Sequence, residues 1–337
     1  MSVLRQVFVR TALVSFACLT FLPLEASAWD RGSVERFAAL PPGSPNPEGI
    51  TADRHGDIYV SGFGPTSPAG PGKVFVFSDE GRLKRVLRVA NSTNALLGLA
   101  FTARGELLVV DFGAGQVLRV NPHTGESSVF MPRPAGAGGL NALTFDKQGN
   151  VYVSDSFAGV IWRTGPAGGP ATEWKRDALL TTSGFPPFGA NGLQFNSDES
   201  ALFVANTGSD SVVRIESVAG AAGAASVFTN SINGADGLII DDDDNVWVCA
   251  NQADEIVVTD PTGKAIAKLG DFEGVRQGAP VGLLFPASLV RVGGWIYVTN
   301  LSLDLRLFGL PQSVDSQWAA EVTTHTIARL RARIPRQ

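Results

Sequence analysis

Four oxygen-bearing side chains occupy one position of a motif that recurs six times along the chain. In the motif a variable residue is followed by Gly or Ala and then by an aliphatic residue. The six copies are Glu48-Gly49-Ile50, Leu97-Gly98-Leu99, Asn141-Ala142-Leu143, Asn191-Gly192-Leu193, Asp236-Gly237-Leu238 and Val281-Gly282-Leu283, at spacings of 49, 44, 50, 45 and 45 residues. The first position is therefore Glu, Asn or Asp in four copies and apolar in the other two.

Two carboxylates and two amides, if they meet at one point, favour a divalent cation. Glu48 and Asp236 would repel each other in a desolvated channel unless a cation lay between them. The donors are hard oxygens without His or Cys, which predicts Ca²⁺, with Mg²⁺ or Mn²⁺ as alternatives, rather than zinc. Calcium takes six to eight oxygens, so coordination positions stay open for water or substrate, as a Lewis-acid catalyst requires. Taken singly, each residue would more often cap a turn, and it is their common register that favours a shared site.

Each copy of the motif begins a unit that reads as four short strands. Predicted second strands span 57–60, 106–110, 150–153, 201–204, 245–248 and 295–298, third strands span 73–77, 116–120, 160–163, 211–215 and 255–259, and fourth strands include 83–89 and 265–269. A lone four-stranded sheet cannot bury both faces, so a period of 44 to 50 residues predicts stacked propeller blades. We predict an all-β, six-bladed β-propeller with four-stranded antiparallel blades. The first strand of each blade would line the central channel and bring the motif residues to one mouth.

The two ends of the mature chain are predicted to share one blade. Residues 33–40 resemble a fourth strand without a blade of its own, and the last unit, with 325–334 as its third strand, lacks a fourth. Pairing of these segments would close the ring. We therefore predict a single propeller domain over residues 29–337.

The first 28 residues have the three parts of a secretory signal peptide. Arg5 and Arg10 precede an apolar run over 11–24, and Ala26-Ser27-Ala28 forms a small-x-small cleavage site. A run of about fourteen residues is too short to cross a bilayer as a helix, and no later segment is longer, so no membrane span is expected. We predict cleavage after Ala28 and a periplasmic or secreted protein. Cys249 would then be the one remaining cysteine, which leaves no intramolecular disulfide.

Charge narrows the range of partners. With 27 Lys and Arg against 32 Asp and Glu, the net charge is -5, so a basic surface for nucleic acid is not expected. The sequence does not determine the oligomeric state.

The order of these site residues resembles the regucalcin/gluconolactonase family, also called the senescence-marker-protein and lactonase-like group of six-bladed propellers. The resemblance is carried by Pro47-Glu48-Gly49, Leu140-Asn141, Asn191-Gly192-Leu193 and Asp236-Gly237-Leu238-Ile239-Ile240-Asp241. It implies that Glu48, Asn191 and Asp236 bind the metal, that Asp236 is also the catalytic base, and that Asn141 contacts the substrate or the metal, of which we expect the substrate. The implied reaction is metal-dependent hydrolysis of a lactone or related ester.

One position departs from the sugar-lactone members of that family, which have an Arg two residues before the first Asn. Here that position is Gly139, which argues against a sugar-acid substrate. Loops predicted at the mouth contribute Phe185, Pro186, Pro187, Phe188 and Phe272. These residues either form an apolar wall for a less polar lactone or ester, or pack the loops against the blades.

Two other functions remain open. A non-catalytic propeller of the NHL-repeat type would bind a protein or small ligand, with Glu48 and Asp236 capping turns. A strictosidine-synthase-like propeller would condense its substrates rather than hydrolyse them. A histidine-driven mechanism is disfavoured, because His55, His123 and His325 are not predicted at the mouth.

Several other polar residues are expected to be structural. Residues 241–244, all Asp, read as a solvated hairpin turn at the opposite end of the channel, and Cys249 reads as a buried small hydrophobe. Four residues that end second strands either support the site from behind or, more often, cap turns: Asp111, Asp155, Asn206 and Asn300.

Overall fold

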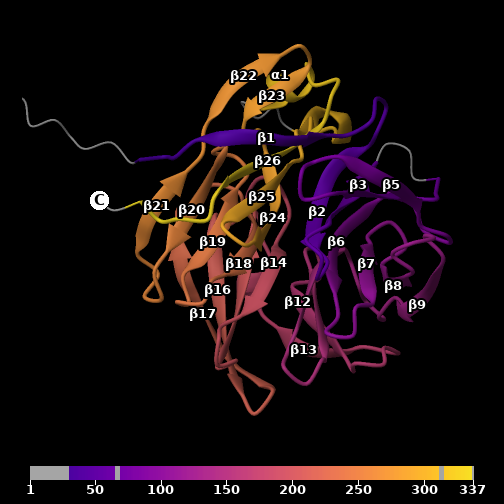
Figure 1. Cartoon of the computed structure of the whole chain (residues 1–337). Helices are drawn as coiled ribbons and strands as arrows, with labels where there is room; N and C mark the ends of the chain where they lie inside the picture. The colour runs from indigo at the N-terminus through magenta and orange to yellow at the C-terminus, as the bar shows by residue number, and fades with distance from the viewer. Residues whose placement is uncertain (1–29, 65–68, 311–314, 336–337) are drawn as a thin grey trace, which may run out of the picture.

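The computed structural model describes residues 30–64, 69–310 and 315–335 and shows a six-bladed β-propeller. Within these residues the strands form six four-stranded antiparallel sheets and one additional two-stranded hairpin (Figure 1). The predicted fold class is confirmed. The signal peptide predicted for residues 1–28 lies outside the described residues.

Blades 1 to 5 are each built from four consecutive strands. Blade 1 has β2 (Asn46–Ala52), β3 (Ile58–Phe63), β4 (Lys73–Phe77) and β5 (Leu83–Arg88); blade 2 has β6 (Leu96–Phe101), β7 (Leu107–Asp111), β8 (Gln116–Val120) and β9 (Ser127–Met131). Blade 3 has β10 (Leu140–Phe145), β11 (Val151–Asp155), β12 (Val160–Thr164) and β13 (Thr172–Arg176). Blade 4 has β14 (Ala190–Phe195), β15 (Ala201–Asn206), β16 (Ser211–Val218) and β17 (Ala221–Asn230), and blade 5 has β18 (Ala235–Ile240), β19 (Val246–Ala250), β20 (Glu255–Thr259) and β21 (Ala265–Leu269).

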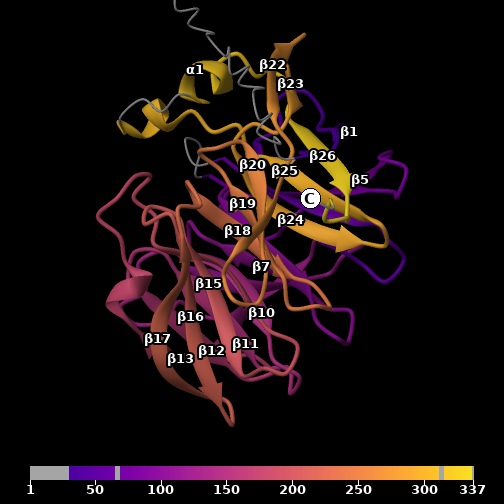
Figure 2. The same ribbon diagram turned by 90° about the vertical axis from the view of Figure 1, so that its left-hand side faces the viewer.

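Blade 6 closes the ring with a strand from each end of the chain. Its order is β1 (Val34–Ala39), β26 (Thr326–Arg331), β25 (Trp295–Asn300) and β24 (Pro286–Val292), so the N-terminal strand is the outermost strand of the last blade. Figures 1 and 2 show β1 beside β26. Val34 pairs with Leu330 across this junction, and Glu35 forms an ion pair with Arg329 at 2.9 Å. The predicted closure is confirmed.

Hydrophobic residues from neighbouring blades form one core cluster at each of the six blade interfaces. At the interface of blades 2 and 3, for example, Val110 and Val117 are clustered with Val153 and Leu143. The junction of blades 6 and 1 has a cluster of its own, in which Phe37 packs edge-on against Tyr297 with ring centroids 4.7 Å apart. Burial of both faces of every sheet requires neighbours on both sides, which is why closure of the ring stabilises all six blades.

A β-bulge interrupts the inner strand of every blade, and in blades 1 to 5 it lies at the repeated motif. The pairing register shifts there, as between Pro47 and Ile50 or between Ala235 and Leu238, and it shifts at the corresponding place in blade 6. A bulge adds a residue to one strand and turns side chains away from the regular alternation, and bulges are common next to active sites. The bulge therefore sets the direction of the first motif residue.

Glycine in the motif permits close approach between adjacent inner strands. An added Cβ at Gly49 would lie 2.4 Å from the carbonyl oxygen of Leu97, and one at Gly237 would lie 2.6 Å from that of Ala287. Gly192 is similarly close to the backbone of blade 5. The backbones of neighbouring bulges are thus in contact around the channel.

The prediction that Val281 begins the inner strand of blade 6 is wrong. Val281 and Gly282 lie in β23 (Ala279–Gly282), which pairs only with β22 (Phe272–Arg276) in a hairpin inserted between blades 5 and 6 (Figure 2). The inner strand of blade 6 is β24, and its bulge lies between Pro286 and Leu289. Ala287 is therefore the residue of blade 6 that corresponds to Glu48, Leu97, Asn141, Asn191 and Asp236. The inserted hairpin happens to contain the motif sequence at the expected spacing.

Three short helices lie in loops of the described part of the chain, one between β13 and β14 and two between β25 and β26. They are η1 (Ala178–Leu180), η2 (Leu305–Phe308) and α1 (Asp315–Ala319), and the sequence analysis did not predict them. Within the described part of the chain, no helix has the length and apolar character needed to cross a membrane.

Candidate metal and substrate site

The four predicted polar residues line one pocket at a mouth of the central channel. Glu48, Asn141, Asn191 and Asp236 come from blades 1, 3, 4 and 5, and each is only 4 to 6% exposed. Leu97 of blade 2 lines the same pocket, whose empty space, including the part open to solvent, is about 430 Å³. The bulges of five inner strands therefore contribute to one site, whereas Val281 does not take part in it.

Each carboxylate of the site has one oxygen without a hydrogen-bond partner. These atoms are Oε2 of Glu48 and Oδ1 of Asp236, and both are buried. Burial of an unpaired carboxylate oxygen is costly unless a cation or a proton compensates it. Two such atoms in one pocket mark a place where a positive ligand would be stabilised.

The amide groups of the two asparagines are held by hydroxyls of the neighbouring strand. Asn141 donates from Nδ2 to Oγ of Ser156 at 3.1 Å, and Asn191 donates from Nδ2 to Oγ1 of Thr207 at 3.0 Å. Ser156 in turn donates to the carbonyl oxygen of Ala190 at 2.7 Å. With the nitrogens engaged in this way, the amide oxygens remain available to a ligand in the pocket.

Asp236 has an equivalent support that the sequence analysis missed. Asn251 donates from Nδ2 to Oδ2 of Asp236 at 2.8 Å. Ser156, Thr207 and Asn251 all directly follow the second strand of their blade, 15 or 16 residues after the residue they support. That nearly constant spacing is the one sign of these residues in the sequence, and its meaning depends on how the two strands pair.

Glu48 is positioned through its backbone. Thr299 donates from Oγ1 to the carbonyl oxygen of Glu48 at 2.6 Å, and Ser61 accepts from the amide of Gly49 at 2.8 Å. Ser61 also donates to the carbonyl oxygen of Leu97 at 2.6 Å. Hydroxyls of blades 1 and 6 thus fix the bulge that carries Glu48.

Burial dominates the electrostatics of the pocket. Desolvation and the neighbouring Asp236 carboxylate raise the pKa of Glu48 well above its usual range. Desolvation also raises the pKa of Asp236 to about 7, against the lowering effect of the Asn251 and Asn191 amides. Burial, with smaller contributions from Asp236 and Glu48, raises the pKa of the Cys249 thiol as well, and this residue lies in a core cluster, as predicted.

The donor set fits a hard cation rather than zinc. No three His, Cys, Asp or Glu side chains that could hold a metal gather anywhere in the described residues. A cation in this pocket would bind the two carboxylates and the amide oxygen of Asn191, with the amide oxygen of Asn141 beside them. All-oxygen sites of mixed charge are typical of Ca²⁺, and the remaining positions would be filled by water or substrate.

Apart from the four site residues and their supports Thr207 and Asn251, the pocket lining is apolar. It comprises Phe63, Leu97, Pro186, Phe188, Phe285, Leu301, Leu303 and Leu305. Of the predicted wall residues, Pro186 and Phe188 line the pocket, and Phe185 packs against the adjoining apolar cluster. The prediction for Phe272 is wrong, because it lies in the inserted hairpin and packs edge-on against Trp318 at 5.5 Å.

The polar residues that end second strands cap loops. Asp155 accepts hydrogen bonds from the backbone amides of Gly138, Gly139 and Ala158. Asp111, Asn206 and Asn300 likewise bond to loop backbones next to their strands. None of the four lines the pocket, so the capping interpretation holds.

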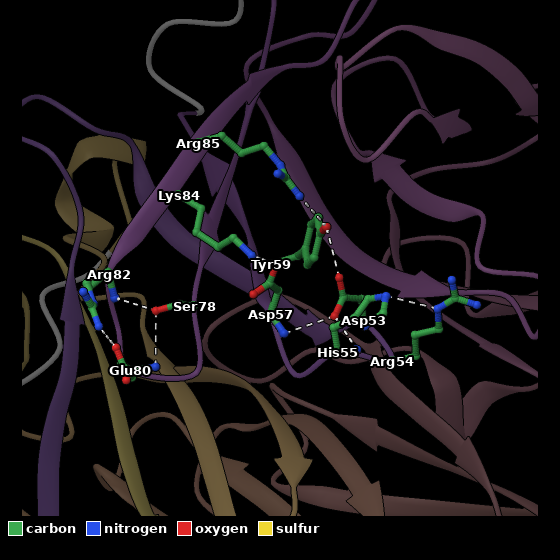
Figure 3. Close-up of polar contacts among 10 residues, drawn as sticks. All are labelled: Asp53, Arg54, His55, Asp57, Tyr59, Ser78, Glu80, Arg82, Lys84 and Arg85. Atoms are coloured by element: carbon green, nitrogen blue, oxygen red, sulfur yellow. Dashed lines mark hydrogen bonds and ion pairs between the residues drawn. The ribbon is translucent and has the colours of Figure 1, made fainter.

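The three histidines lie away from the pocket lining. His55 is exposed in the turn between β2 and β3, where its Nε2 accepts from Nε of Arg54 at 3.2 Å (Figure 3). His123 is exposed in another turn, and burial lowers the pKa of His325 to about 4. The run 241–244 forms the turn between β18 and β19, as predicted.

Comparison with known proteins identifies the family that this site resembles. Residues 139–270 match the family model described as the SMP-30/gluconolactonase/LRE-like region. The chain carries a gluconolactonase-like region. This region contains Asn141, Asn191 and Asp236, whereas Glu48 lies before it. The resemblance predicted from the sequence is confirmed over these residues.

Three solved structures share the fold of this chain. A luciferin-regenerating enzyme superposes with a TM-score of 0.63 at 15% identity, covering 89% of this chain and 95% of its own. A gluconolactonase from Xanthomonas campestris gives 0.61 at 14% identity, with 90% of each chain covered. Regucalcin from Agrobacterium tumefaciens str. C58, a calcium-binding protein, gives 0.61 at 15% identity, covering 87% of this chain and 94% of its own. No curated protein matches the chain in sequence.

Proposed function

We propose that this protein is an exported, divalent-metal-dependent hydrolase that opens a lactone or a related ester. One observation carries the proposal: two buried, unpartnered carboxylate oxygens share an apolar pocket with two asparagines whose amide nitrogens are already engaged. The gluconolactonase-like region and the calcium-binding regucalcin among the structural neighbours support the same reaction class and cation. Ca²⁺ is the expected ion, with Mg²⁺ or Mn²⁺ as alternatives.

Glu48, Asn191 and Asp236 would hold the ion, and Asn141 would contact the substrate. A bound cation supplies a Lewis acid that polarises the acyl carbonyl and stabilises the negative charge that develops on its oxygen. The amide of Asn141, fixed by Ser156, orients the substrate beside the carboxylates. The surrounding apolar wall limits the access of bulk water.

Asp236 is the proposed base of the reaction. Its Oδ1 lines the pocket without a hydrogen-bond partner and is free to accept a proton. Asp236 takes a proton from the attacking water, whose oxygen bonds to the acyl carbon. The bond from that carbon to the ring oxygen then breaks, and the leaving oxygen takes up a proton, so the product is a hydroxy acid.

Of the two other functions, the geometry disfavours one and product analysis tests the other. In a non-catalytic NHL-type propeller, Glu48 and Asp236 would cap turns and accept backbone N–H groups, yet one oxygen of each lacks any partner. A strictosidine-synthase-like propeller would join two molecules at the pocket. Analysis of products separates that reaction from hydrolysis, because hydrolysis consumes water and yields one hydroxy acid per lactone.

The decisive experiment is thermal unfolding of chelator-treated protein with and without millimolar calcium. An ion at about 100 times its Kd adds ~2.7 kcal/mol of stability, which gives a clear rise in Tm. The rise should disappear in Asp236→Ala and Glu48→Gln, and both variants should lose lactone hydrolysis while remaining folded. Asp243→Asn, in an exposed turn, is the control. Full hydrolysis by either site variant would overturn the mechanism, and the absence of a shift with any divalent ion would leave the binding scaffold as the better account.

Export is a separate part of the proposal and rests on residues 1–28 alone. Mass spectrometry of the protein from the periplasmic or secreted fraction should give a chain that begins at Trp29. A full-length chain retained in the cytoplasm would contradict it.

A further inference from the structure

We propose that the substrate is an uncharged lactone or ester with an apolar substituent, and that Phe188 and Leu303 help to select it. This inference rests on the proposed hydrolase function and specifies its substrate class. The starting observation is a division of the pocket into a polar floor and an apolar wall. Every polar lining residue either belongs to the proposed metal and substrate set or is hydrogen-bonded to it.

The wall offers no polar partner to a substituent of the reacting ring. Phe63, Phe285 and the alternate residues Leu301, Leu303 and Leu305 form one apolar cluster above the floor. Phe188 lines the pocket from the loop before blade 4. Hydroxyl groups of a polyhydroxylated ring would lose their hydration against these side chains without gaining hydrogen bonds, which is unfavourable. An alkyl substituent would gain burial there.

Charge in the pocket opposes an anionic substituent. The described lining contains no Lys, Arg or His, and its ionisable groups are Glu48 and Asp236. Another carboxyl lies just behind the wall, because Asp254 accepts the backbone amide of Phe285 at 2.7 Å. A carboxylate or phosphate on the substrate would therefore find no ion pair away from the floor.

Aromatic rings continue the apolar surface from the pocket to solvent. The Phe157 ring lies 5.2 Å from that of Phe188, and Phe112 connects it to Phe63 through two edge-on contacts of 6.1 Å. Phe157 is 49% exposed. A Cβ at Gly139 would lie only 2.7 Å from the Phe157 ring, so that ring occupies the space that a longer side chain at 139 would need. The entrance thus suits a chain that extends out of the pocket.

Comparison of kcat/KM for matched lactones tests this specificity. The probes are alkyl lactones of one ring size with increasing chain length, a polyhydroxylated lactone of the same ring, and an alkyl lactone that ends in a carboxylate. We expect kcat/KM to rise about fourfold per added methylene until the wall is filled, and to fall more than tenfold for the carboxylate-ended probe. Phe188→Ala and Leu303→Ala should lower the ratio of long-chain to short-chain kcat/KM at least tenfold. Phe272→Ala, outside the pocket, should leave that ratio unchanged.

A binding measurement separates failure of this inference from failure of the proposed function. Lactams matched to the same probes are not readily hydrolysed, and their effect on Tm is measured in calcium-loaded protein. Greater protection by the alkyl lactam supports the inference even if no lactone is hydrolysed, an outcome that would overturn the hydrolase function alone. Faster hydrolysis of the polyhydroxylated or carboxylate-ended lactone, or stronger protection by its lactam, would overturn the substrate class and leave hydrolysis intact.

Discussion

Asn251 donates a hydrogen bond from Nδ2 to Oδ2 of Asp236 at 2.8 Å, linking the end of the second strand of blade 5 to the bulge of its inner strand. The orientation of the Asn251 amide is itself fixed, because its Oδ1 accepts from Nε2 of Gln252 at 3.0 Å. One oxygen of Asp236 is therefore engaged from behind, and the other, Oδ1, is left without a partner in the pocket. Asn251 is a positioning residue for the proposed metal site.

Replacement of this positioning residue should weaken metal binding. We expect Asn251→Leu to raise the Kd for calcium about 10-fold to 100-fold, because groups that orient a ligand typically contribute this much to metal affinity. Titration calorimetry measures the Kd. Thr207→Val should act in the same direction through Asn191, whereas Gln148→Ala, at an exposed turn residue, is the control. Unchanged calcium affinity in Asn251→Leu would contradict the positioning role.

Neutralising one carboxylate should stabilise the metal-free protein. Glu48 and Asp236 are buried, and burial raises the pKa of both, so at pH 8 their ionised forms oppose folding when no cation is bound. We expect Glu48→Gln to raise the free energy of unfolding by on the order of 1 kcal/mol or more at pH 8 in chelator. In saturating calcium the native protein should instead have the larger free energy of unfolding, because it keeps both carboxylates that bind the ion.

Urea unfolding with and without calcium measures both values. Glu126→Gln, at an exposed position, serves as the matched control and should change neither value. If Glu48→Gln is less stable than the native protein in chelator, the Glu48 carboxylate does not destabilise the metal-free pocket.

Close contact between neighbouring bulges makes the motif glycines sensitive to an added methyl group. A Cβ at Gly237 would lie 2.6 Å from the carbonyl oxygen of Ala287 and 2.8 Å from Cα of Ser288, both backbone atoms. We expect Gly237→Ala to lower the free energy of unfolding by about 1–3 kcal/mol, as overpacking typically does, and to weaken calcium binding through Asp236. Gly294→Ala, which meets nothing within 4 Å, should stay within about 0.5 kcal/mol of the native protein. Equal stability of the two variants would contradict the close packing of the bulges.

The sequence was sufficient to predict the blades because their signal is local and repeated. The third strands at 73–77, 116–120 and 255–259 match β4, β8 and β20 residue for residue. The four polar site residues were found for the same reason, since the bulge places one motif position of each blade toward a common axis. Periodicity fails at Val281, where an inserted hairpin repeats the motif letters outside a blade.

The contacts missed by the sequence analysis depend on pairing between strands. Ser156, Thr207 and Asn251 are polar residues in ordinary loop positions, and their partners become evident only once the second strand is paired with the bulged inner strand. Phe272 was misplaced because the hairpin that carries it turns away from the pocket and meets Trp318. The short-range pattern therefore predicted the four polar residues that line the pocket, whereas long-range packing determined the residues that support them and the apolar wall.

A second pair of buried carboxyls helps to hold the segment that carries Leu301, Leu303 and Leu305 of the apolar pocket wall. Asp254, in the turn before β20, shares a side-chain hydrogen bond with Asp315 at the start of α1. Arg306 of η2 also donates to the carbonyl oxygen of Ser316 at 3.0 Å, so α1 is tied both to blade 5 and to the segment that follows Leu305. Two carboxyl groups can share a hydrogen bond only while one of them holds a proton.

Stability should therefore fall as this pair loses its proton. Burial and the nearby Asp315 raise the pKa of Asp254 to about 8, and burial raises the pKa of Asp315 to about 6, with Asp271 adding to the negative charge around Asp254. Because both pKa values lie above those of unfolded Asp, near 3.9, the folded state binds more protons, and this contribution to stability declines between about pH 4 and pH 8. Asp254→Asn keeps a donor to Asp315 and cannot ionise. Its free energy of unfolding should exceed that of the native protein by on the order of 2 kcal/mol at pH 8, and the difference should vanish near pH 4.

Urea unfolding across this pH range, with the exposed Asp243→Asn as control, measures that difference. A difference that stays constant with pH would mean that the two carboxyls titrate alike in the folded and unfolded chains, and that the wall is fastened by Arg306 and packing rather than by the shared proton.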